Sequence, residues 1–164
     1  MKQLDLGCGL AKVSGATGID VIPHRGVDLV HDLNIVPWPV ETGAYDLIHC
    51  RHIVEHVATL ASFLREIHRT GRPGARVEIV TPHFSNRCSY ADPAHLRHLS
   101  LRSFDFFTHG SPVKSPAWWE RVLETRQTFG DGTFPVHFRC RRIFLSFGRP
   151  FRLIGIQWLA NRWP

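Results

Sequence analysis

The chain has 164 residues, of which 43% are hydrophobic, and it carries a formal net charge of +6. This length suits one compact domain over residues 1–164, and because the sequence shows no bilayer-spanning apolar run and no charged-then-apolar leader, we expect a cytoplasmic protein. The four cysteines show no CxxC spacing, which argues against a thiolate zinc motif or a disulfide framework and predicts free thiols.

Strand and helix signals alternate along the first half of the chain, which is typical of an α/β protein with a parallel sheet. Each strand signal is short, rich in β-branched residues or leucine, and closed by a polar residue. The predicted strands are residues 3–6, 18–22, 27–32, 45–50 and 76–81. We therefore expect a Rossmann-like, mostly parallel sheet flanked by helices.

One clear helix follows the fourth predicted strand. Apolar residues recur on one face over residues 57–69, and Gly71 followed by Pro73 ends the pattern. Residues 82–116 then form a long, proline-punctuated stretch with at most one helix, near residues 100–107. Because long loops at strand ends usually carry function, we expect residues 82–116 to cover the substrate.

The first two strands each end in an acidic residue, and the first also leads into a glycine turn. The segments are Leu4-Asp5-Leu6-Gly7-Cys8-Gly9 and Gly18-Ile19-Asp20-Val21. Bare backbone and carboxylates at neighbouring strand ends predict a nucleoside-binding crevice, in which the second acid accepts hydrogen bonds from a ribose. A dinucleotide fingerprint is disfavoured, because Lys12 replaces its third glycine and Asp20 follows Gly9 by 11 residues instead of about 20.

In chain order, these segments resemble the motifs of class I S-adenosylmethionine-dependent methyltransferases over residues 3–84. The further matching segments are Val30-His31-Asp32-Leu33, Tyr45-Asp46-Leu47-Ile48, His52-Ile53-Val54-Glu55-His56-Val57, and the helix, turn and strand through residue 81. The resemblance implies a seven-stranded-type sheet and S-adenosylmethionine as the cofactor. The residues that it assigns to the cofactor site are Asp5, Gly7, Gly9, Lys12, Asp20, Val21, Asp32, Leu33 and Cys50.

The first connection departs from the usual family pattern. Only residues 10–17 separate the glycine loop from the second strand, which is short for a crossover helix, so we expect a turn or a single helical coil. A variant with a lysine and a glycine here, Lys12 and Gly15 in this chain, is similar within the family. Lys12 is then expected near the cofactor carboxylate, and a solvated loop lysine is the alternative.

Three residues directly after the fourth strand, Cys50, Arg51 and His52, are expected to line the transfer site. Methyl transfer needs mainly alignment of the nucleophile with the methyl group and exclusion of water. We assign Arg51 and His52 to the catalytic group, with His52 as the general base that a hydroxyl acceptor requires. A structural histidine at a helix start is the alternative for His52.

A second group of polar side chains lies in residues 82–116. It consists of His83, Cys88, Asp92, His95 and His98. The stretch Asp92-Pro93-Ala94-His95 is similar to an Asp-Pro-x-His stretch in methyltransferase relatives, and we place His95 with the catalytic residues. This group can orient a polar acceptor, supply a base or hold a divalent metal, while ordinary loop hydrogen bonding is the alternative.

The segment His52-Ile53-Val54-Glu55-His56 also matches H-x-x-E-H, the pattern of inverted zinc proteases. Histidines four residues apart share one face of a helix, which suits zinc. Because the pattern falls inside a nucleoside-binding sheet, we expect neither a protease nor a bound metal.

The excess positive charge is concentrated near the end of the chain, where residues 121–164 hold eight arginines and two acids. Predicted strands at residues 121–129 and 137–147 form a C-terminal antiparallel hairpin through a glycine turn at residues 130–132. Residues 149–164 form an amphipathic segment with three arginines. Packing on the sheet, contact with another subunit and peripheral membrane contact are the alternatives for this segment.

We predict an enzyme that transfers a methyl group from S-adenosylmethionine to a small or medium-sized acceptor. The available bases favour an oxygen nucleophile, such as one on a sugar or glycan precursor. The alternative is a domain that binds the cofactor but acts as a partner subunit with weak catalysis. Nucleic acid is not an expected partner, and the sequence leaves the oligomeric state open.

Overall fold

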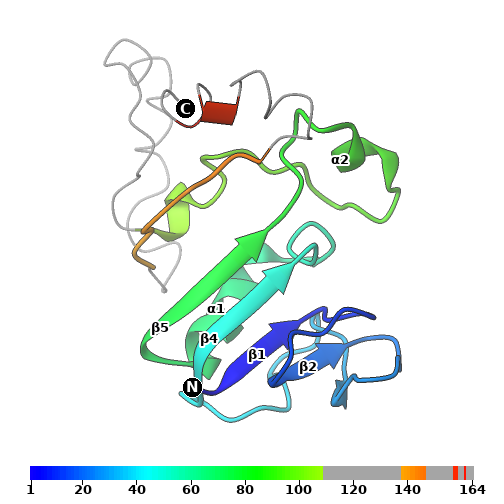
Figure 1. Ribbon diagram of the computed structural model, residues 1–164, viewed down its shortest axis with the longest axis vertical. Coiled ribbons are helices and arrows are strands. Elements are labelled where there is room, and N and C mark those ends of the chain that lie inside the picture. Colours follow the sequence, from blue (N-terminus) through cyan, green and yellow to red (C-terminus); the bar gives the residue numbers. More distant parts are fainter. Residues whose placement is uncertain (109–137, 147–156, 159–160, 162–164) are drawn as a thin grey trace. The chain divides into compact units, whose positions relative to one another are not determined.

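The computed structural model describes residues 1–108, 138–146, 157–158 and 161 (Figure 1). The chain divides into two compact units, Met1–Leu99 and Ser100–Pro164, which are treated separately below. The expectation of one domain over the whole chain stays a prediction. All of the strands and both α-helices of the described residues belong to the first unit.

The first unit is built on a parallel sheet of five strands in the order β3-β2-β1-β4-β5 (Figure 1). The strands are β1 (Gln3–Leu6), β2 (Ala16–Asp20), β3 (Leu29–Val30), β4 (Tyr45–Arg51) and β5 (Gly71–Val80). This order confirms the predicted Rossmann-like α/β fold. The described residues contain five strands of one sheet, so the seven-stranded type is not confirmed.

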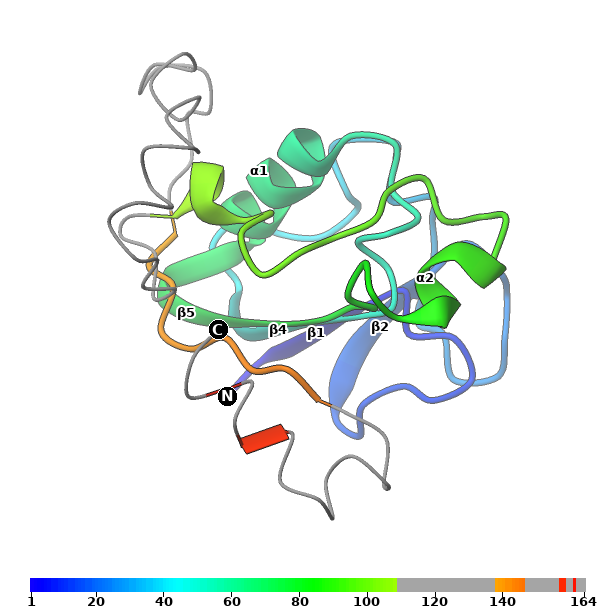
Figure 2. The same ribbon diagram turned by 90° about the horizontal axis from the view of Figure 1, so that it is seen from above.

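The core lies between the sheet and α1 (Leu60–Thr70), which covers one face of the sheet (Figure 2). Phe63, Leu64 and Ile67 are buried along one side of α1, as the helical spacing predicts. Trp38 meets Phe63 edge to face, with ring centroids 5.3 Å apart. The central strands β1 and β4 are buried on both faces, which explains their nearly continuous apolar sequences.

The connection from β1 to β2 is a chain of turns and bends over residues 7–15, as predicted. It is held without a crossover helix by hydrogen bonds to buried groups of the sheet. The Val13 N–H donates to Asp5 Oδ2 at 2.7 Å, and the Arg51 guanidinium donates to the Ala11 carbonyl at 2.6 Å. A short loop can therefore join two neighbouring parallel strands here.

Several predicted boundaries are wrong. The second strand begins at Ala16 and ends at Asp20, and the third contains only Leu29–Val30, because it pairs with β2 at the sheet edge over two residues. Helix α1 begins at Leu60, three residues later than the spacing predicts. Strand β5 begins at Gly71, directly after α1, and a register irregularity separates its first pair from the rest.

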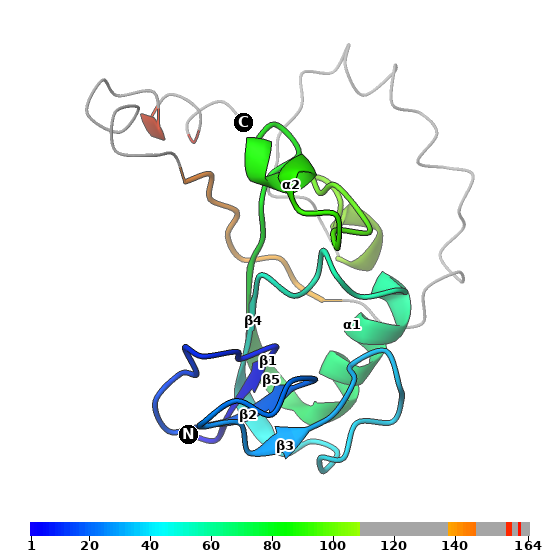
Figure 3. The same cartoon turned by 90° about the vertical axis from the view of Figure 1, so that its right-hand side faces the viewer.

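Residues 82–99 contain a helix that the sequence pattern does not predict, α2 (Arg87–Ala91). It lies beyond the carboxyl ends of β4 and β5 (Figures 1 and 3). Its five residues are too few for apolar periodicity, but the Asn86 side chain accepts the Cys88 N–H at 2.9 Å, which is an N-cap. The signal for this helix was therefore a capping residue.

In the second unit, the helix expected near residues 100–107 is a single 3₁₀ turn, Asp105–Phe107. The predicted strand at residues 121–129 lies outside the described residues, as do most of residues 149–164. Of the predicted strand at residues 137–147, the described part shows one bridge, a parallel pairing of Phe138 with Thr108. The C-terminal hairpin is therefore not confirmed. Among the described residues, no helix is long and apolar enough to cross a membrane.

Candidate functional site

The carboxyl ends of β1, β2 and β4 lie at one edge of the sheet. Chain direction through the sheet reverses at β1, because β2 pairs on one side of it and β4 on the other (Figure 1). Open parallel sheets bind ligands in the crevice at such a switch point. Gly7 follows β1, Asp20 closes β2 and His52 follows β4, so residues from three predicted motifs meet at this edge.

The glycine loop after β1 is hydrogen-bonded to the end of β2. Gly7 and Gly9 have φ angles of 65° and 50°, and the Gly7 N–H donates to the Ile19 carbonyl at 2.9 Å. The Gly9 N–H donates to Asp20 Oδ2 at 2.8 Å. Among the described residues, no atom stands within 4 Å of the position that a Cβ on Gly9 would take. The loop therefore presents open main chain beside a carboxylate.

Gly7 is required by its conformation and by its neighbour. A Cβ on Gly7 would stand 2.8 Å from Ile53 Cδ1, whereas a Cβ on Gly15, whose φ is 76°, would meet no described atom within 4 Å. We expect Gly7→Ala to lower the free energy of unfolding by about 2–3 kcal/mol, and Gly15→Ala by about 1 kcal/mol, in urea titrations. Equal losses in the two variants would contradict the close approach of Ile53.

Asp5 is fully buried beneath this loop. Its Oδ2 accepts the Val13 N–H at 2.7 Å and Arg51 Nη2 at 3.0 Å. Its Oδ1 is buried and has no hydrogen-bond partner in the part of the chain that the structure describes. Arg51, predicted to be catalytic, is instead held against Asp5 and the Ala11 carbonyl, so its placement supports a role in fixing the loop.

Lys12 lies away from the position that the resemblance implies. Its Nζ is 2.7 Å from Asp28 Oδ2, and its side chain crosses Gly18, where a Cβ would stand 2.5 Å from Lys12 Cδ. Hydrogen bonds from Lys12 and from the Gly18 N–H hold the pKa of Asp28 below its usual range. The structure thus favours the alternative of a loop lysine, here with Asp28 as its partner.

The remaining predicted cofactor residues fall into exposed and buried sets. Val21 is 61% exposed directly after Asp20, and Asp32 lies in the loop after β3, where it accepts the Asn34 N–H at 2.9 Å. Leu33 and Cys50 are buried. Burial raises the pKa of the Cys50 thiol, which stays neutral in the core, so a direct contact of this thiol with a ligand is not favoured.

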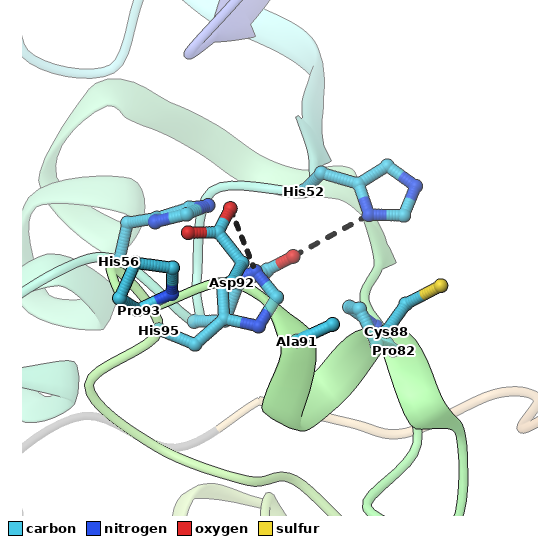
Figure 4. Close-up of a pocket in the computed structure, with 9 residues that line it drawn as sticks. His52, His56, Pro82, Cys88, Ala91, Asp92, Pro93 and His95 are labelled. Atoms are coloured by element: carbon cyan, nitrogen blue, oxygen red, sulfur yellow. Dashed lines mark ion pairs between the residues drawn. The ribbon is translucent and has the colours of Figure 1, made fainter.

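A pocket of about 530 Å³ opens between the loop after β4 and α2. It is lined by His52, Glu55, His56, Pro82, Cys88, Ala91, Asp92, Pro93 and His95 (Figure 4). Two of the three predicted catalytic residues, His52 and His95, line this pocket together, and Arg51 does not. Ile53 contacts Gly7 and is the next residue after His52, so one short segment joins the glycine loop to the pocket.

The H-x-x-E-H segment is not helical, which corrects the predicted helical face. Residues 52–56 form a bend and a turn, and His52 has a φ of 53°. The zinc-protease pattern requires both histidines on one helical face, and this condition is not met. Glu55 and His56 were therefore underestimated as pocket residues, although their motif was visible in the sequence.

Comparison with known proteins assigns the family. Residues 1–127 match a family model described as a methyltransferase domain, and this match spans most of the chain. The chain belongs to this methyltransferase family. S-adenosylmethionine is the cofactor that such a family implies. No curated protein sequence matches the chain.

Solved structures with low sequence identity share the fold of this methyltransferase domain. A SAM-dependent methyltransferase from Archaeoglobus fulgidus is 16% identical, with a TM-score of 0.51 over 98% of this chain and 78% of that one. A chain of the Haloferax volcanii complex between the Trm112 methyltransferase activator and a methyltransferase is 18% identical, with a TM-score of 0.50 over 63% of this chain. The YcgJ protein from Bacillus subtilis is 22% identical, with a TM-score of 0.49 over 63% of this chain. This methyltransferase domain spans 58% of the Bacillus protein and 57% of the Haloferax chain.

The edge of the methyltransferase sheet fits an adenosine cofactor with a charged amino acid end. Gly9 leaves open space beside its main chain, and Asp20 supplies a carboxylate next to it. The unpartnered Oδ1 of Asp5 offers a buried acceptor under the same loop. Exposed Val21 adds an apolar side chain at the end of β2. These observations agree with a nucleoside-binding crevice at the switch point.

Proposed function

We propose that this chain binds S-adenosylmethionine at the carboxyl edge of β1 and β2 and transfers its methyl group to a small or medium-sized acceptor through an oxygen nucleophile. The observation that carries the proposal is the hydrogen bond from the Gly9 N–H to Asp20 at the switch point of the sheet. It brings the two motifs that define the predicted cofactor site into one crevice.

Each cofactor residue has a stated task in this proposal. Asp20 accepts hydrogen bonds from the ribose hydroxyls, and Gly7 and Gly9 let the ligand lie against main chain. Asp5 Oδ1 accepts from the cofactor's ammonium group, which satisfies an otherwise unpaired buried oxygen. When bound, the cofactor supplies an electrophilic methyl group on a sulfonium.

On the acceptor side, His52 is the proposed general base. Its imidazole is 64% exposed, and its Nδ1 lies 3.4 Å from Glu55 Oε1, which can orient the ring (Figure 4). A base at this place removes the proton of a hydroxyl acceptor while the nucleophile is held in the pocket. His95, with its side chain almost fully buried, shapes the opposite wall of that pocket.

Calorimetric titration with S-adenosylmethionine tests the cofactor site. We expect Asp20→Asn to weaken binding by about 10–100-fold, because it removes a charged acceptor from the ribose. Asp46→Asn is the matched control, since Asp46 stands near the beginning of β4, at the opposite end of the same parallel sheet. Equal affinities in the two variants would count against the assignment of Asp20.

Turnover separates the enzyme from the partner-subunit alternative. The chain is mixed with S-adenosylmethionine and a panel of hydroxyl, amine and thiol acceptors, and release of S-adenosylhomocysteine is measured. Release with hydroxyl acceptors supports the proposal. Tight cofactor binding without release for any acceptor favours a partner subunit, and release with amines alone rejects the oxygen nucleophile.

A further inference from the structure

The pocket beside α2 brings together three side chains of the kind that bind metal ions. Glu55 and His56 follow β4, whereas His95 comes 39 residues later and follows α2. One potential ligand atom from each lies within 4.8 Å of the others. The rings of His56 and His95 meet edge to face with centroids 4.7 Å apart (Figure 4). We propose that Glu55, His56 and His95 bind a divalent transition-metal ion, with Zn²⁺ as the preferred ion.

Backbone hydrogen bonds prepare both imidazoles as ligands. His56 Nδ1 is 3.1 Å from the Ala94 carbonyl, and His95 Nδ1 is 3.0 Å from the Ser89 carbonyl. A carbonyl oxygen only accepts, so each Nδ1 must carry the hydrogen. In the neutral rings, Nε2 is then the atom with a free lone pair. Metal-binding histidines are usually oriented by this kind of second hydrogen bond.

Glu55 provides the anionic ligand and has an unmet requirement. The residue is only 2% exposed, and its Oε2 accepts Thr81 Oγ1 at 3.0 Å. Its Oε1 is buried without a hydrogen-bond partner in the described residues and lies 3.4 Å from His52 Nδ1. A buried carboxylate oxygen without a partner is costly, and a cation in the adjoining pocket would compensate it.

The two segments that carry the ligands are held together by further hydrogen bonds. The Leu96 N–H donates to the Glu55 carbonyl at 2.9 Å. Arg97 donates to the carbonyls of Val54 and Ala58 at 3.0 and 2.9 Å. These contacts fix the distance between the loop after β4 and the loop after α2, so the ligands are positioned before an ion binds.

The set of two imidazoles and one carboxylate selects the class of ion. It is a ligand set of zinc sites that keep one coordination position open, whereas Mg²⁺ and Ca²⁺ prefer oxygen ligands alone. Two ligands of a tetrahedral zinc ion lie about 3.3 Å apart, so small side-chain rotations would close the present arrangement. Asp92 Oδ2, 3.7 Å from His95 Nε2, stands at the open side of the site. The inference rests on these contacts alone and does not require the proposed methyl transfer.

Zinc titration of the full chain, stripped with a chelator, tests the site by calorimetry. His56→Asn and His95→Asn are chosen because an asparagine amide can still donate to the Ala94 or Ser89 carbonyl but offers no Nε2. We expect about one ion per wild-type chain, with affinity lowered more than ~100-fold in both variants. His68→Ala, at an exposed histidine of α1, is the control and should bind zinc like the wild type.

Thermal unfolding without zinc shows whether each variant is folded, and Glu55→Gln replaces any variant that is not. Zinc should raise the melting temperature of the wild type and of His68→Ala, and should not raise that of the ligand variants. The proposal is overturned if the stripped wild type does not bind zinc. It is also overturned if the ligand variants keep the wild-type affinity, or if His68→Ala loses affinity to the same extent.

Discussion

Replacing His52 by glycine is expected to lower methyl transfer by about 100–10,000-fold, the range of a lost general base. The fold should persist, because His52 has a φ of 53°, a conformation that glycine adopts without strain. Its side chain is also largely exposed, so little packing is lost. Turnover is measured as S-adenosylhomocysteine release with a hydroxyl acceptor, and cofactor affinity by calorimetry.

The same replacement separates chemistry from structure. His52→Asn provides a second variant that tolerates positive φ and lacks a base, and it should lose turnover to the same extent. Added imidazole should restore part of the rate in His52→Gly, because the variant leaves space where the ring was. Unchanged turnover in both variants, with unchanged cofactor affinity, would remove His52 from the catalytic group.

Replacing Arg69 by methionine is expected to lower the free energy of unfolding by about 3–5 kcal/mol at neutral pH. Arg69 donates to both carboxylate oxygens of Glu66 at 2.8 Å and to the carbonyls of Trp38 and Val40. Glu66 also accepts the Trp38 N–H at 2.8 Å. Without the guanidinium, a buried carboxylate and several carbonyls between α1 and residues 38–42 lose their partner.

Urea titrations with two further variants define the origin of this loss. Arg65→Met changes an exposed arginine of the same helix and should alter the free energy of unfolding by less than about 0.5 kcal/mol. Glu66→Gln combined with Arg69→Met should be more stable than Arg69→Met alone, because no buried charge is left unpaired. A double variant that is less stable than the single one would contradict the ion-pair explanation.

The loss should also depend on pH. Burial alone would raise the pKa of Glu66, but hydrogen bonds from Arg69 and from the Trp38 N–H outweigh burial and lower it. A carboxylate with a lowered folded-state pKa stabilises the fold above its unfolded pKa of about 4.3, and this contribution disappears as the pH falls through the folded value. The difference between wild type and Arg69→Met should therefore shrink below about pH 4.

Much of the cofactor edge could be predicted because its signals are local. The glycine turn after β1 and the acid at the end of β2 are adjacent to strands in sequence, and parallel strands bring their carboxyl ends to one edge. The apolar spacing of α1 likewise reports its buried face. Such patterns identify an element and its buried side, but they do not define its ends, as the two-residue β3 shows.

Tertiary structure alone decided which distant side chains meet. Arg51 reaches Asp5 across 46 residues, and His95 meets Glu55 and His56 across about 40, through loops whose paths no periodicity describes. The tautomers of the two histidines follow from backbone carbonyls that only the folded chain brings near. Sequence by itself determined the family and the cofactor edge, because both rest on short motifs attached to strands. The pocket beside α2 depends on loop packing, and only the folded structure could show it.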